Sequence, residues 1–143
     1  MVAMNTATVP GSFGQTAFGS PTGPVGSGCL GYASGLNGTV TQITNRATGV
    51  TLNTLTGQIT TINTSLAAAV NAVFTVTNST VAISDVVLVA IQSGSNGGNT
   101  AVYVQSVAAG SFVISVSNLN DTGGTAETGA IIINFCVVKC PTT

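Results

Sequence analysis

Histidine and tryptophan are absent from this chain of 143 residues, and charged residues make up only 3% of it. Without histidine, imidazole metal sites and His-dependent catalytic triads are excluded. The carboxylates are Asp85, Asp121 and Glu127. Only the last two are close in sequence, and their spacing matches no EF-hand loop. The sequence therefore predicts a protein that is not an enzyme and that holds no cofactor and no metal.

Positive charge is equally scarce, because Arg46 and Lys139 are the only cations and the net charge is -1. Binding to nucleic acid phosphates needs clustered Lys and Arg, and so does attraction to an anionic membrane surface. The longest aliphatic run, residues 86–91, falls far short of the roughly 20 residues that span a bilayer. We expect neither a nucleic acid nor a membrane as partner.

The cysteines do not form a disulfide framework, because there are three of them, Cys29, Cys136 and Cys140. On one extended strand the last two would lie about 13 Å apart, beyond disulfide reach. The first residues, MVAMNTATVPGSFG, show no basic n-region and no apolar h-region. We expect synthesis in a reducing cytoplasm, with the thiols behaving as small hydrophobic groups.

The first part of the chain, residues 1–38, is rich in Gly, Ser, Thr and Pro and is predicted to be an extended arm. Three prolines interrupt any regular element: Pro10, Pro21 and Pro24. Phe13, Phe18 and Tyr32 stand singly among glycines. We interpret them as anchors that enter pockets of a neighbouring subunit; the alternative is an arm that folds back on its own domain.

Residues 39–143 are predicted to form one β-sandwich domain, because apolar residues recur there with a period of two. Phe74 and Val76 face one side of their strand, while Thr75 and Thr77 face the other. The predicted strands are residues 39–44, 49–54, 57–62, 72–78, 86–91, 100–106, 112–117 and 130–138. Glycine or Asx residues suggest turns at residues 55–57, 94–99, 108–110 and 121–124.

Only residues 65–71, SLAAAVN, have the composition for a helical turn or two. Short strands at this spacing indicate an all-β protein with a jelly-roll-like, antiparallel β-sandwich of about eight strands. The predicted fold thus consists of a sandwich preceded by a Gly- and Pro-rich N-terminal arm.

The last predicted strand is apolar on both sides. One side presents Ile131, Ile133, Phe135 and Val137. The other side presents Ile132, Asn134, Cys136 and Val138. In a two-layer sandwich, a strand apolar on both faces indicates a subunit interface, for which we expect a homotrimer. The alternative is an ordinary central strand covered by a loop.

Several stretches of the sequence resemble a family of small virion proteins of tailed bacteriophages. They are TQITNRATGVTLNTLTGQITTINTSLAAAVNAVFTVTNSTV, DVVLVAIQSG, VQSVAAGSFVISVSN and GAIIINFCVVK. The resemblance rests on the order of TGVTLN, GQIT, FTVTN, VAAGSF and INF and covers residues 39–139. The arm before residue 39 has no counterpart in it.

The resemblance implies a capsid decoration or cement protein, made in the host cytoplasm, that binds the major capsid protein at the capsid surface and stabilises the shell. Arg46, which lies in a predicted turn, would then pair with an acidic patch on the shell or cap its own loop. The rival hypothesis is a trimeric tail-fibre or head-fibre module that binds a host receptor or glycan.

Overall fold

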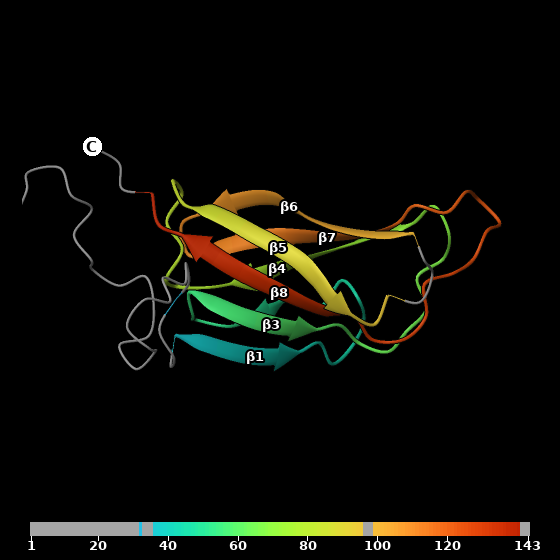
Figure 1. Ribbon diagram of the computed structural model, residues 1–143, viewed down its shortest axis with the longest axis horizontal. Coiled ribbons are helices and arrows are strands. Elements are labelled where there is room, and N and C mark those ends of the chain that lie inside the picture. Colours follow the sequence, from blue (N-terminus) through green and yellow to red (C-terminus); the bar gives the residue numbers. More distant parts are fainter. Residues whose placement is uncertain (1–31, 33–35, 96–98, 141–143) are drawn as a thin grey trace, which may run out of the picture. The chain divides into compact units, whose positions relative to one another are not determined.

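The computed structural model describes residues 32, 36–95 and 99–140, and within them it confirms the all-β prediction (Figure 1). The eight strands are β1 (Asn37–Thr41), β2 (Val50–Thr51), β3 (Thr56–Thr60), β4 (Asn71–Thr77), β5 (Val86–Ser93), β6 (Thr100–Ala108), β7 (Ser111–Asn118) and β8 (Ile132–Val138). None of the described segments is a helix that could cross a membrane. Phe13 and Phe18 lie outside the described residues.

Two four-stranded sheets form the sandwich. Sheet A has the order β1-β3-β8-β5 and sheet B the order β2-β4-β7-β6. Most pairs are antiparallel, but β1–β3 and β2–β4 are parallel. The first four strands alternate between the two sheets. As a result, β3 runs parallel to β1 in sheet A, and β4 runs parallel to β2 in sheet B. The sandwich prediction is confirmed, and the parallel pairs are its one departure from a wholly antiparallel arrangement.

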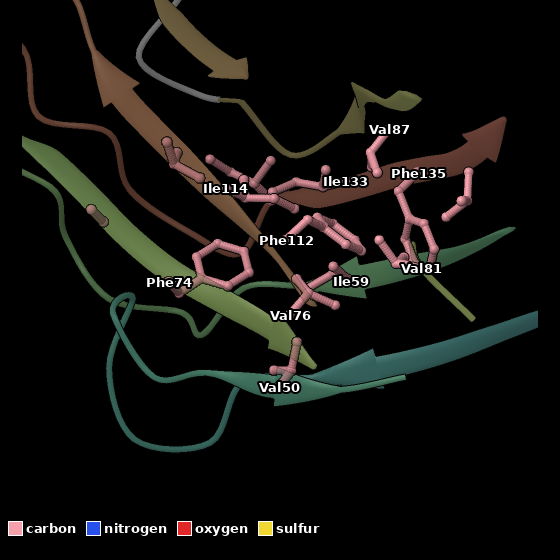
Figure 2. Packing of buried hydrophobic residues seen from close by; sticks show 14 of the residues in the cluster. Val50, Ile59, Phe74, Val76, Val81, Val87, Phe112, Ile114, Ile133 and Phe135 are labelled. Atoms are coloured by element: carbon pink, nitrogen blue, oxygen red, sulfur yellow. The ribbon is translucent and has the colours of Figure 1, made fainter. Parts of the chain in front are cut away.

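The core fills the space between the two sheets, as the alternating pattern predicted. Phe74 and Val76 on β4 point inward, with 2% and 0% of their surface exposed. Across the interior, the rings of Phe112 from β7 and Phe135 from β8 lie 5.4 Å apart at an angle of 53°. Figure 2 shows side chains from both sheets pointing toward one another. Fifteen buried apolar residues thus join the sheets into one domain.

Residues 65–71 do not form the predicted helical turn. Leu66 instead forms an isolated antiparallel bridge with Glu127, and its side chain is buried. Ala69 has a positive φ of 60°, which an α-helix does not allow. The alanines of this segment favour a helix, but burial of Leu66 against the domain determines its conformation.

The turn predicted at residues 55–57 is also wrong, because Gly57 lies within β3 and is buried. A Cβ atom on Gly57 would come within 2.8 Å of the side chains of both Leu52 and Phe135. Gly38, its partner on β1, would meet Leu52 at 2.7 Å. These glycines therefore allow neighbouring side chains to pack closely against the backbone, and they do not form a tight turn.

Candidate interaction surface

The outer face of sheet A divides into an apolar and a polar half. Strands β5 and β8 supply the apolar half-face, which consists of Val86, Leu88, Ala90, Cys136 and Val138. Val86 pairs with Val138, Leu88 with Cys136 and Ala90 with Asn134. Val86, Leu88 and Val138 expose 48%, 55% and 42% of their surface. Exposed apolar residues in contact with one another mark interaction sites more often than scattered ones do.

Strands β1 and β3 supply the polar half of this face. Asn37, Thr39 and Thr41 alternate along β1 and pair with Thr56, Gln58 and Thr60 of β3. Gln58 donates a hydrogen bond of 2.9 Å to Gln92, so the amides meet across β8. A hollow on this side is lined by the hydroxyl and amide side chains together with Asn134. These side chains offer hydrogen-bond donors and acceptors but no charge.

The structure brings four of the predicted interface residues together on the outer face of sheet A: Ile132, Asn134, Cys136 and Val138. Asn134 and Val138 are exposed, while Ile132 and Cys136 are half-buried. Tyr32 is half-buried and lies outside any strand. The sequence-based interface set missed Val86 and Leu88, although the run VVLVAI carries the same two-sided apolar signal as β8.

The opposite face of the sandwich, on sheet B, is different. Tyr103 on β6 and Val73 on β4 are exposed by 45% and 40%, but the serines between them on β7, Ser115 and Ser117, are buried. Hydrogen bonds with Ser115, and to a lesser extent with Ser117, lower the pKa of the Tyr103 phenol. Buried hydroxyls therefore separate Tyr103 from Val73 on this face.

Arg46 is buried within its own domain, with 5% of its surface exposed. Its Nε donates to the carbonyl of Thr64 at 2.6 Å, its Nη1 to the hydroxyl of Thr61 at 3.3 Å and its Nη2 to the carbonyl of Gly129 at 2.6 Å. Burial lowers the pKa of Arg46, and the charge of Glu127 partly offsets that effect. Arg46 therefore does not cap its own loop but links its turn to the segments around Thr61, Thr64 and Gly129.

Glu127 is the second charged group in this region and is fully buried. Its carboxylate accepts hydrogen bonds from the hydroxyls of Thr100 and Ser95. Asp121, the nearest acid in sequence, is exposed. Among the described residues, no group of three or more Cys, Asp or Glu side chains could hold a metal ion. Glu127 therefore belongs to the internal network around Arg46.

Asp85 and Lys139 form an ion pair, which sequence patterns do not reveal because 54 residues separate the two side chains. Lys139 Nζ lies 2.5 Å from Asp85 Oδ2 and also donates to the carbonyl of Thr80 at 2.8 Å. The carboxylate accepts backbone N–H bonds from Ala82 at 2.7 Å and Cys140 at 3.2 Å. This clamp holds the end of β8 against the start of β5, beside the apolar half-face.

The clamp makes the domain sensitive to acid. Burial alone raises the pKa of Asp85, but the hydrogen bonds from Ala82, Lys139 and Cys140 and the charge of Lys139 lower it below the ordinary 3.8. A depressed folded-state pKa gives stability that is fully present above 3.8 and is lost as the pH falls through the folded pKa. We expect the melting temperature to fall in that acidic window.

The corresponding variant is Asp85→Asn, which should lose most of this acid dependence. At neutral pH we expect it to cost about 1–3 kcal/mol, because buried donors are left poorly paired. Thermal melts across the pH range measure both effects. Asp121→Asn is the matched control, since it removes an exposed carboxylate; equal acid dependence in wild type and Asp85→Asn would contradict the role of the clamp.

The thiols of Cys136 and Cys140 are free. Burial raises the pKa of Cys136, which disfavours the reactive thiolate at neutral pH. Cys136 thus contributes to the apolar half-face as a small hydrophobic group.

No model of a protein family, no characterised protein and no solved structure matches this chain. The candidate site therefore rests on the geometry of the domain itself.

Proposed function

We propose that this chain is a non-enzymatic structural protein of a bacteriophage particle, which binds the capsid surface as a decoration or cement protein and stabilises the shell. The single observation that supports the proposal most is the apolar half-face on the outside of sheet A. It is continuous over two strands and uncharged.

The energetics suit a protein present in many copies on a lattice. Burying a Val or Leu side chain contributes roughly 1.5–3 kcal/mol, so a small apolar patch is enough to hold each copy to its neighbours in the trimer. Linked sites multiply the effective affinity without any new kind of contact. In this proposal the apolar half-face holds the copies of a homotrimer together, and the trimer binds the major capsid protein through its remaining surface and its N-terminal arms.

The test is a charge placed in the apolar half-face. Val138→Asp should convert trimers to monomers in light scattering and reduce occupancy on particles by at least about tenfold, because an aspartate must be desolvated at the interface. Val73→Asp is the matched control, since Val73 is exposed to nearly the same extent, 40% against 42%, on the opposite face. A wild-type protein that stays monomeric at micromolar concentration and on particles would contradict the proposal.

A second candidate is a trimeric fibre module that binds a host receptor or glycan. The hollow over β1, β3 and β8 favours it, because hydroxyl and amide side chains such as Gln58 and Asn134 line this hollow. The number of copies per particle separates the two candidates. Hundreds of copies indicate a shell protein, and a few tens or fewer indicate a fibre or tail protein.

A further inference from the structure

The four edges of the two sheets differ in how well they are protected. Strand β5 contains a register shift between Ile91 and Ser93, and β6 contains one between Val104 and Ser106. These two edge strands also lie side by side across the sandwich. Strand β2 has only two residues. Short length and bulges are the devices by which natural sheets avoid pairing with other chains.

Strand β1 has none of these devices. It is five residues long and regular, and NGTVT contains no charge and no proline. Among the described residues its only strand partner is β3, and Figure 1 shows it at the end of sheet A. An edge of this kind is a template for another strand.

The hydrogen bonds at the two ends of β1 define which backbone groups are free. Thr56 donates to the carbonyl of Leu36, and Gln42 donates to the carbonyl of Thr60. Backbone groups alternate along a strand, so the even-numbered residues face β3. The N–H and C=O groups of Asn37, Thr39 and Thr41 therefore point away from β3, toward the open edge. All three residues are exposed.

We propose that residues 2–9 of a neighbouring copy, VAMNTATV, add to β1 as a further strand of sheet A. This segment is uncharged, contains neither glycine nor proline, and is followed directly by Pro10. Its valines and threonines favour an extended strand. The inference rests on the self-association part of the proposed function and adds to it the identity of the contact made by the arm.

The length of the connection favours a neighbouring copy over the same chain. Residues 10–36 separate the segment from β1, which gives 27 connecting residues. Hairpin loops within a domain usually have two to five residues, and structureless connections longer than about 15 residues are uncommon. Fully extended, 27 residues span roughly 90 Å, which is long enough to reach the β1 edge of the next copy in an oligomer.

The experiment measures amide hydrogen exchange of the full chain below and above the protein concentration at which trimers form. We expect residues 2–9 and 37–41 to exchange at least about tenfold more slowly in the oligomer than in the monomer. Thr6→Pro and Thr39→Pro should each abolish this protection, because proline removes the N–H and does not fit a paired strand. The controls are Thr16→Pro, elsewhere in the arm, and Thr39→Ala, which keeps the N–H.

Mixing the two proline variants identifies the source of the strand. Copies with Thr6→Pro keep an intact β1, and copies with Thr39→Pro keep an intact segment 2–9, so their mixture should regain part of the protection. Thr6→Pro lies outside the described domain, which keeps the test valid if Thr39→Pro fails to fold.

Protection that is independent of concentration, with no recovery on mixing, would place the strand in its own chain and overturn the inference. Intact trimers without protection of residues 2–9 would overturn it as well, while leaving the proposed function in place. A wild-type protein that forms no trimers at all would count against both.

Discussion

Replacing Arg46 by methionine is expected to lower the free energy of unfolding by about 3–5 kcal/mol. Removing one of two buried charges that interact electrostatically has this magnitude, because the remaining charge stays buried without its counter-charge. Here the remaining charge is Glu127, with 0% of its surface exposed. The carbonyls of Thr64 and Gly129 would lose their donors as well. Urea unfolding at neutral pH measures the change.

Lys139→Met is the matched control, since it removes the other cation of the chain. Its side chain is 46% exposed, and the buried Asp85 carboxylate keeps its two backbone donors, so the loss should be smaller than that of Arg46→Met. The double variant Arg46→Met with Glu127→Gln should recover part of the stability lost in Arg46→Met. Equal effects of the Arg46 and Lys139 substitutions would show that the buried network contributes little.

Truncation of Phe112 is expected to have a comparable effect, with Phe112→Ala costing about 3–5 kcal/mol. This ring is fully buried and packs against Phe135 of the other sheet at 5.4 Å, so its loss leaves a cavity between the layers. Phe112→Leu preserves most of the volume and should cost less than about 1.5 kcal/mol. Val113→Ala, one residue along and half-buried on the outer face, is the positional control. A melting temperature for Phe112→Ala close to that of Val113→Ala would contradict this description of the core.

Period-two patterning predicted the eight strands and the inward residues, although only Val50–Thr51 of the predicted strand 49–54 form a strand and β1 ends at Thr41 rather than at residue 44. Phe74, Phe112 and Phe135 point into the core as expected, because alternating side chains must separate an apolar face from a polar one. The pairing partners were not predictable in this way. Local alternation contains no information on which strand comes next in a sheet, so the parallel pairs β1–β3 and β2–β4 appear only in three dimensions.

The misassigned positions have a common physical cause. Gly57 is typical of a turn by its type, but its small size leaves room for the side chains of Leu52 and Phe135, and Phe135 is far away in the sequence. The alanines in residues 65–71 favour a helix locally, whereas tertiary pairing of Leu66 with Glu127 determines their conformation. In both cases a contact from far along the chain overrides the local preference.

The residues on the outer face of sheet A were predictable in part. The two-sided apolar character of β8 is visible in the sequence and led to Ile132, Asn134, Cys136 and Val138, which do share one outer face. The contribution of Val86 and Leu88 required the pairing of β5 with β8. The role of Arg46 required its three oxygen acceptors, which come from loops as far as 83 residues away.

The central position of β8 affects the order in which the chain can fold. This strand lies between β3 and β5 in sheet A, yet it follows every other described strand in the sequence. During synthesis β3 and β5 emerge first, and neither can be paired on its β8 side until residues 132–138 have left the ribosome. Sheet B, by contrast, contains the β6–β7 hairpin and the β4–β7 pair, all complete by Asn118. All strands of sheet B are therefore available for pairing before β8 can complete sheet A, and the strand that contributes to the apolar half-face is also the last strand that the described fold requires.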